Sequence, residues 1–218
     1  MKKQKLLRLT AILLLSALLT VLAGGCVTIG DRKPICTLTF SNGGEVTIRL
    51  YPDKCPNTVN NFIELCNSGF YDGSPVHRIV EYVLIQMGMP ADSEETDAGY
   101  YIKGEFTANK HAKGDLTFES GIVGMARLSD EENSQRFFDT ASSQFFIMLE
   151  PKANMDGYYA AFGKVVTGMD VITAISKMDV DADNYPRDEI TIVSARVDCH
   201  DYQPAAVKKL EKDSTKLY

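Results

Sequence analysis

The sequence predicts a mainly β domain, either a β-barrel or an α+β arrangement, built as one unit after residue 34. A hairpin signal opens this region, short apolar runs recur as far as residue 197, and only two segments have helical spacing. The chain has 218 residues and no internal repeat, which is enough for one domain with a full core. We therefore expect a single domain over 35–200.

The first two strands have the clearest local signal. Ile35–Phe40 and Glu45–Leu50 each alternate apolar and polar residues, as strands with one buried face do. Ser41–Gly44, with the sequence Ser-Asn-Gly-Gly, lies between them and suits a tight turn. The two segments should form a hairpin.

Two further segments are predicted to be helices. Pro56 suits a first helical turn, and Gly69 suits the residue that ends a helix. The second helix is expected over Met169–Met178. The core-facing stripes are Val59, Phe62, Ile63 and Cys66 in the first helix and Val171, Ile172 and Ile175 in the second.

The other strands are short apolar runs. Residues 90–121 are rich in Gly, Asp, Glu and Lys and should be mostly loop. Residues 201–218 form a tail that we expect to be a surface helix or disordered. The predicted strands are Val76–Val80, Val83–Met87, Ile122–Ala126, Gln144–Leu149, Ala160–Val166 and Ile190–Val197.

Residues 1–25 are predicted to be a secretory signal. A basic start precedes a short apolar run, as in a signal peptide rather than a membrane span. Small residues then lead to Cys26, which resembles the lipidated Cys of a bacterial lipoprotein, although Leu22 lies one place further from it than usual. We predict a lipid on Cys26, a tether over 26–34 and an extracytoplasmic protein anchored to the bacterial cell membrane. A simple cleaved signal and an uncleaved anchor are the alternatives.

Charge and cysteine content exclude several functions. The formal net charge is −6 at pH 7, which gives no case for nucleic-acid binding. The spacing of Cys and His offers no metal site, and we expect no cofactor. Cys55 and Cys66 bracket the first helix and are too far apart to bridge. Cys36 and Cys199 lie in the first and last strands and could either pair or remain buried thiols.

Two segments far apart in the sequence place polar side chains among strand-like apolar residues. Arg78 and Gln86 lie in the strand pair 76–87, and Gln144 begins the run 144–149. A polar group on a buried strand is costly unless it is hydrogen-bonded or meets a ligand. The two segments therefore suggest one site built across a sheet face.

These motifs, in their order along the chain, resemble the cyclophilin family of peptidyl-prolyl isomerases over about residues 35–199. The resemblance implies a closed eight-stranded antiparallel barrel capped by two α-helices, with the substrate groove on the outside. The matching motifs are Pro56–Phe62, Gly69–Gly73, His77-Arg78, Gln86, Ile102–Phe106, Gly124–Ala126, Ser143–Ile147, Met155–Gly157 and Phe162–Val165.

The implied reaction is rotation of an X–Pro amide across a barrier of about 18–20 kcal/mol. No covalent bond changes, so neither a nucleophile nor a metal is required. Arg78 would stabilise the lone pair that develops on the proline nitrogen, and Gln86 would orient Arg78 or bind the substrate backbone. Phe146 would form the floor of the proline pocket. Substrate contacts are implied for His77, Val83, Leu84, Ala126, Gln144, Asn154, Met155 and Tyr159.

The chain departs from the family pattern at several of these positions. Val83 replaces a pocket Phe, Asn154 replaces a common Trp, and Tyr159 replaces the pocket His or its usual bacterial substitute. Loss of the Phe ring predicts a shallower pocket and reduced activity. The loop 127–143 is longer than usual and could either contact partners or be a solvated insertion.

We therefore expect a monomeric isomerase that acts on proline-containing peptides or unfolded segments of exported or cell-envelope proteins. The alternative is a non-catalytic proline-peptide binding module or chaperone on the same scaffold. A ligand-carrying β-barrel lipoprotein would need an open apolar interior, whereas Phe62, Ile63 and Phe145 should fill it.

Overall fold

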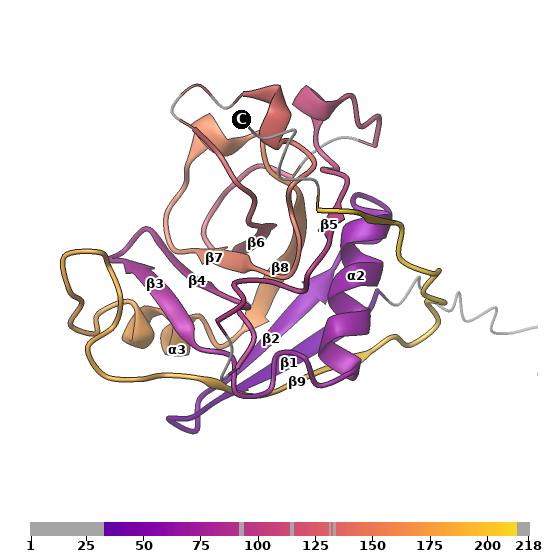
Figure 1. Ribbon diagram of the computed structural model, residues 1–218. Coiled ribbons are helices and arrows are strands. Elements are labelled where there is room, and N and C mark those ends of the chain that lie inside the picture. The colour runs from indigo at the N-terminus through magenta and orange to yellow at the C-terminus, as the bar shows by residue number, and fades with distance from the viewer. Residues whose placement is uncertain (1–32, 92–93, 114–115, 131, 133, 213–218) are drawn as a thin grey trace, which may run out of the picture. The chain divides into compact units, whose positions relative to one another are not determined.

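The computed structural model describes residues 33–91, 94–113, 116–130, 132 and 134–212 (Figure 1). The predicted signal over 1–25, Cys26 and most of the tether lie outside the described residues, as does the end of the tail after residue 212. Within the described part of the chain, no helix combines the length and apolar character needed to cross a bilayer.

The N-terminal hairpin is confirmed. Strand β1 (Ile35–Phe40) pairs antiparallel with β2 (Glu45–Leu50), and Leu38 lies opposite Val46. Alternate residues of both strands are buried, as their sequence pattern predicts. Gly43 has a φ of 82° in the connecting turn, a conformation that glycine adopts without strain.

The two helices also form where the sequence places them. Helix α2 (Pro56–Asn67) has Pro at its start, and Gly69 follows its end with a φ of 79°. Its first-turn N–H groups donate to the buried carboxylate of Glu105, from Asn57 to Oε1 at 3.1 Å and from Thr58 to Oε2 at 2.8 Å. Helix α3 (Met169–Ile175) ends three residues earlier than predicted.

Eight strands form one antiparallel sheet in the order β3-β4-β7-β6-β8-β2-β1-β9, on which α2 and α3 lie at opposite ends (Figure 1). Two short strands, β5 and β10, form a separate antiparallel pair. The strand bounds are β3 Val76–Val80, β4 Leu84–Met87, β5 Tyr101–Ile102, β6 Ile122–Met125, β7 Phe145–Met148, β8 Ala161–Thr167, β9 Ile192–Asp198 and β10 Lys209–Leu210.

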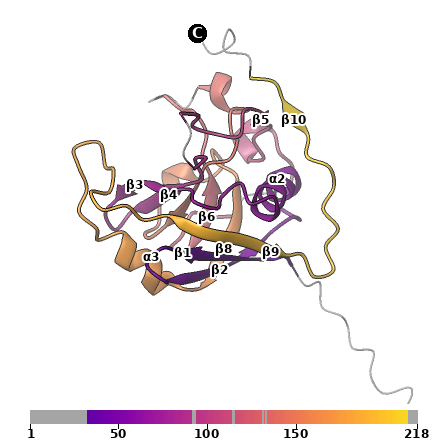
Figure 2. The same ribbon diagram turned by 60° about the horizontal axis from the view of Figure 1, so that its bottom comes forward.

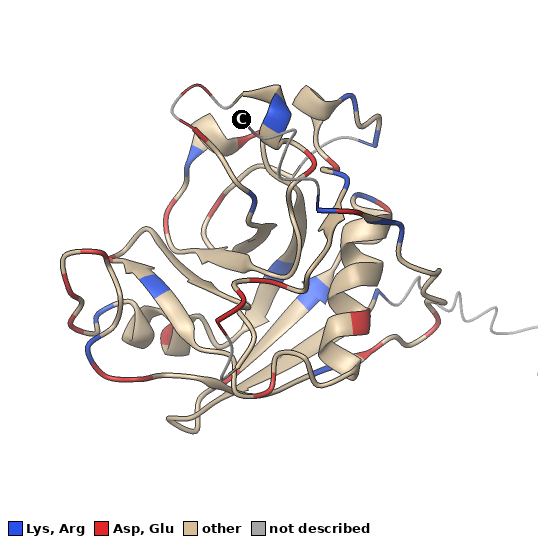
Figure 3. Cartoon of the chain, in the orientation of Figure 1, with Lys and Arg blue, Asp and Glu red and all other residues tan. Residues whose placement is uncertain are grey.

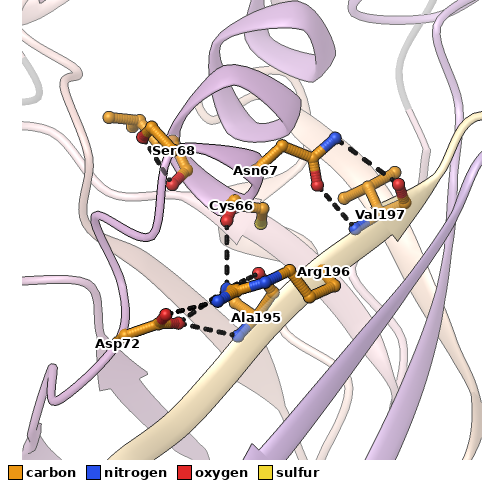
Figure 4. Close-up of polar contacts among 8 residues, drawn as sticks. Cys66, Asn67, Ser68, Asp72, Ala195, Arg196 and Val197 are labelled. Carbon is orange, nitrogen blue, oxygen red and sulfur yellow. Dashed lines mark hydrogen bonds and ion pairs between the residues drawn. The ribbon is translucent and has the colours of Figure 1, made fainter.

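The predicted closed barrel is wrong in one respect, because the sheet is an open half-barrel that ends at β3 and β9. Side chains from the end of α2 and the turn after it occupy the outer edge of β9 (Figure 4). Asn67 exchanges two hydrogen bonds with the backbone of Val197, and Asp72 accepts one from the N–H of Ala195. These edge groups are therefore not available for a continuous ladder with β3. The segment at the start of β3 still meets the start of β9 through the isolated bridge from Pro75 to Thr191 and through backbone hydrogen bonds from Gly73 to Ile192 and from Val76 to Ile190.

The interior of the half-barrel is filled by aromatic side chains. Phe62 of α2 lies 5.1 Å from Phe145 and 5.0 Å from Phe162, measured between ring centroids, and 5.5 Å from Tyr71. All four side chains are fully buried. This packing excludes the ligand-carrying barrel, which needs an open interior.

The possible Cys36–Cys199 disulfide does not form, and no cysteine in the described residues is joined to another. Cys36 lies opposite Val197 in the β1–β9 pair, which places Cys199 two residues further along. The nearest thiol to Cys36 is Cys66 on α2, with 3.9 Å between the sulfur atoms. Burial raises the pKa of Cys66 well above its ordinary value, which keeps this thiol protonated and unreactive.

The described part of residues 90–121 is mostly loop, as predicted, and contains β5 and a 3₁₀ turn, η1 (Thr107–Asn109). The surface helix expected in the tail does not form over residues 201–212, which are extended, with β10 paired to β5. Figure 2 shows the tail running from β9 past α2 towards β5. Two-residue strands carry no periodic pattern, so the sequence gives no signal for them.

Candidate functional site

Three neighbouring strands bring the predicted catalytic residues together. In the ladder formed by β3, β4 and β7, Arg78 lies opposite Gln86, and Gln86 lies opposite Phe146. Directly opposite residues share a face of an antiparallel sheet, so the three side chains are on one face. The register of β3 shifts between Val76 and Arg78, which leaves His77 buried beside the exposed Arg78.

A chain of hydrogen bonds links the polar side chains of this face. Arg78 Nη1 lies 3.4 Å from Gln86 Oε1, and Gln86 Nε2 donates to Gln144 Oε1 at 2.8 Å. Gln144 Nε2 in turn donates to the carbonyl oxygen of Thr96 at 2.7 Å. Gln144 therefore connects the strand pair to the loop before β5. The Arg78 guanidinium is therefore the last group in this series of hydrogen bonds, and the Arg78 side chain is exposed to solvent.

His77 completes this arrangement as a neutral group. Its Nε2 lies 3.1 Å from Gln144 Oε1, the oxygen that also accepts a bond from Gln86. An amide oxygen can only accept, so the His77 nitrogen is the donor. Burial lowers the pKa of His77, and the nearby charge of Arg78 acts in the same direction. His77 therefore supports Gln144 and is not poised to transfer a proton.

An apolar cluster separate from the main core lies beside the polar chain. Phe146 is 3% exposed and is packed with Leu84 among the buried members of this cluster. Four other predicted substrate contacts are half-buried against it: Val83, Ala126, Met155 and Tyr159. Asn154 lies exposed on the 3₁₀ turn η3 (Ala153–Met155), outside the cluster. The structure thus gathers the predicted pocket residues, with Asn154 at the rim.

Phe118 is a buried member of the apolar cluster around Phe146, and the sequence analysis missed it. Its ring stacks on Phe146 with 5.7 Å between centroids and an interplanar angle of 29°, and Tyr159 meets Phe146 edge-on at 5.9 Å. A Cβ atom at Gly124 would lie only 2.3 Å from the Phe146 ring, so glycine is required for this packing. The alternation of Leu116 and Phe118 within a polar loop was the one available signal.

A hollow of about 280 Å³ adjoins the polar chain on the side away from Arg78. Gln86, Ala126 and Gln144 form its wall towards the site, and Arg127 and Lys212 form part of the rest. Arg127 donates to the carbonyl oxygens of Leu128 and Tyr158, at 2.8 and 3.1 Å. The hollow meets the apolar cluster at Ala126, which belongs to both.

The long loop 127–143 has packing of its own. Phe138 is buried and meets Phe106 edge-on at 5.1 Å, and the Arg127 guanidinium lies over both rings, at 5.2 and 5.5 Å from their centroids. Tyr159 lies still closer to Arg127, at 4.4 Å. The base of the loop is thus part of the folded domain, while Glu132 near its tip is exposed.

The site therefore combines an exposed cation with an apolar floor. In the described residues no group of three or more His, Cys, Asp or Glu side chains is placed to hold a metal ion. An amide that rotates needs no bond to be broken, and a guanidinium beside an apolar floor can favour its twisted form. This arrangement has the two components that the predicted proline-peptide site requires.

The comparisons with known proteins agree with this geometry. The family profile "Cyclophilin type peptidyl-prolyl cis-trans isomerase/CLD" matches residues 35–197. Peptidyl-prolyl cis-trans isomerase B of Bacillus subtilis is 37% identical over 141 residues, which cover 65% of this chain and 90% of the relative. The human peptidyl-prolyl cis-trans isomerase-like 1 is 32% identical over 153 residues, covering 70% of this chain and 86% of the relative.

A solved structure gives the same result. The crystal structure of a Cryptosporidium parvum cyclophilin type isomerase in the presence of the dipeptide Ala-Pro has a TM-score of 0.64 and 25% identity, and the alignment covers 75% of this chain and 98% of that one. The chain belongs to the cyclophilin-type family, and it is a peptidyl-prolyl cis-trans isomerase. The roles assigned to its individual side chains remain predictions.

Proposed function

We propose that this isomerase acts on X–Pro bonds of exported or cell-envelope proteins, anchored by a lipid on Cys26, and that it is slower than relatives with a complete aromatic pocket. The observation that carries the proposal is the position of Arg78, held through Gln86 beside the apolar cluster around Phe146. The basic and apolar pattern of residues 1–25 supports export.

The catalytic step follows from these positions. The proline ring of the substrate lies on Phe146, which removes apolar surface from water and fixes one side of the bond. Rotation makes the proline nitrogen pyramidal, and Arg78 donates to its lone pair. Because the planar amide offers no such lone pair, the interaction is stronger in the twisted state than in either isomer, which is the condition for catalysis.

Val83 supports the expectation of a reduced rate. It is half-buried against the same cluster as Phe146 and Leu84, so a ring at this position would contact the bound proline. An aromatic contact of this kind contributes about 0.5–1.5 kcal/mol. Valine cannot make this contact, which corresponds to a rate lower by roughly twofold to thirteenfold.

Exchange between the cis and trans forms of a proline peptide, measured by NMR, tests the rate directly. We expect Val83→Phe to raise kcat/KM by about twofold to thirteenfold. Val193→Phe is the matched control, because Val193 is an exposed valine on β9, away from the cluster. An unchanged or lower rate in Val83→Phe would contradict the proposal of a weakened pocket.

The same measurement separates the enzyme from a binding module on this scaffold. A binder would hold the peptide, seen as shifted peptide resonances, without accelerating exchange. The wild-type chain should do both. Binding without acceleration would favour the chaperone alternative.

Fractionation of cells tests the anchor. We expect the wild-type chain in the membrane fraction and Cys26→Ala in the soluble fraction, because Cys26 is the predicted site of the lipid. Cys199→Ala serves as the control, since Cys199 belongs to the folded domain. Retention of Cys26→Ala in the membrane would show that the lipid is not the anchor.

A further inference from the structure

The C-terminal segment 202–212, here called the strap, is fixed along the outer face of α2. The Tyr202 hydroxyl donates to Asn60 Oδ1 at 2.6 Å. Further along, Lys208 and Asn57 exchange two hydrogen bonds, at 2.8 and 3.2 Å. Figures 1 and 2 show the strap passing from one end of the helix to the other. These contacts fix the path of the strap along α2, although most of the strap has no regular secondary structure.

The last described residue of the strap, Lys212, lines the hollow beside Gln86 and Gln144. Strand β10 of the strap pairs with β5, with Leu210 opposite Tyr101. Lys212 follows, and its Nζ lies 2.7 Å from Asp97 Oδ1. This part of the strap is mainly basic, with Lys208, Lys209 and Lys212 around the single acid Glu211 (Figure 3). The two side chains of the ion pair are 31% and 14% exposed, so water screens this pair less than a fully exposed one.

Lys212 is thereby connected to the catalytic arginine through one continuous path. Asp97 is covalently next to Thr96, whose carbonyl oxygen accepts from Gln144 Nε2. Gln144 Oε1 accepts from Gln86, and Gln86 lies within hydrogen-bond reach of Arg78. Thr96 itself is exposed, so its carbonyl depends on neighbouring contacts for its position. The ion pair between Asp97 and Lys212 is one of these contacts, and a second is the bond from Gly99 N–H to Asp97 Oδ1 at 2.8 Å.

We propose that Lys212 is a positioning residue for the isomerase reaction. By holding Asp97, it keeps the Thr96 carbonyl where it orients the Gln144 amide, and the Gln144 amide orients Gln86 and Arg78. The inference rests on the function proposed for Arg78. It assigns the C-terminal strap to the active site, although the strap lies outside the segment 35–197 that matches the family profile.

Charge-neutral variants of the full-length chain test the proposal. We expect Lys212→Met to lower kcat about fivefold with KM within about twofold, because the ion pair holds Asp97 in place. A larger rise in KM would mean that Lys212, which lines the hollow, binds the substrate directly, and would overturn the proposal. Lys209→Met is the matched control: Lys209 lies on the same strap and forms an ion pair of the same length, 2.7 Å to Glu64 on α2, rather than to Asp97. Lys212→Arg should restore most of the rate, since it restores the ion pair.

A double-mutant cycle shows whether Lys212 acts through Asp97. Asp97→Asn should lower kcat as much as Lys212→Met does, and the double variant should lose no more than either alone. Additive losses, or equal losses in Lys212→Met and Lys209→Met, would overturn the proposal. Melting temperatures of the variants should agree to within a few degrees, because the pair is at the surface.

An NMR measurement separates this inference from the proposed function. The side-chain amide resonances of Gln144 should shift in Lys212→Met and stay unchanged in Lys209→Met, whether or not the protein accelerates exchange. If catalysis is present and depends on Arg78 but not on Lys212, the inference fails and the proposed function stands. If the wild-type chain is inactive, the proposed function fails, and the Gln144 resonances alone decide whether Lys212 holds the path.

Discussion

Replacement of Arg78 by alanine is the most direct test of the catalytic assignment. It removes the cation from the face shared with Gln86 and Phe146 and leaves the strand backbone intact. A fixed donor at a site of developing charge contributes about 2.7–4 kcal/mol when it is shielded from water. Arg78 is exposed, and its contact to Gln86 Oε1 is long at 3.4 Å, so we halve this contribution to about 1.5–2 kcal/mol. At about 1.36 kcal/mol for each factor of ten, kcat/KM should fall roughly 10- to 30-fold.

The assay is NMR exchange on a proline peptide, at a peptide concentration below KM. Arg49→Ala is the matched control, because Arg49 is another exposed strand arginine, on β2. Both variants should keep the wild-type melting temperature, since neither side chain is buried. Arg78→Lys keeps the charge but loses the planar fork and should lie between wild type and alanine. A rate in Arg78→Ala equal to that of wild type would refute the reasoning, whatever the fold.

Two other predictions concern groups that support the site. The pKa of His77 in the folded state lies below its unfolded value of about 6.5, so the stability contributed by neutral His77 is complete above pH 6.5 and is lost as the pH falls towards the folded pKa. In urea unfolding between pH 7.5 and 5, the unfolding free energy of the wild type should therefore fall more steeply than that of His77→Gln. Parallel curves for the two proteins would contradict this prediction. Phe118→Ala should cost about 3–5 kcal/mol of unfolding free energy and also reduce activity, because the fully buried ring stacks on Phe146; a stable variant with full activity would show that Phe118 does not support the pocket floor.

The sequence by itself determined the elements that have local signals. Ser41–Gly44 specified the first hairpin because few residues tolerate the backbone of a tight turn. Pro56 and Gly69 marked the limits of α2, whose apolar stripe faces the core. The order of the motifs around Arg78 and Phe146 was sufficient to identify the family, whose profile matches residues 35–197.

Only the tertiary structure decided whether the sheet closes and which distant residues pack beside the site. The sheet stays open because the side chains of Asn67 and Asp72 occupy the edge of β9, a contact between segments more than 120 residues apart. The stacking of Phe118 on Phe146 and the ion pair of Lys212 with Asp97 also join segments that are separated along the chain. Periodicity reports which face of a segment is buried, whereas these contacts depend on where distant segments arrive in space, and that is settled only when the whole chain packs.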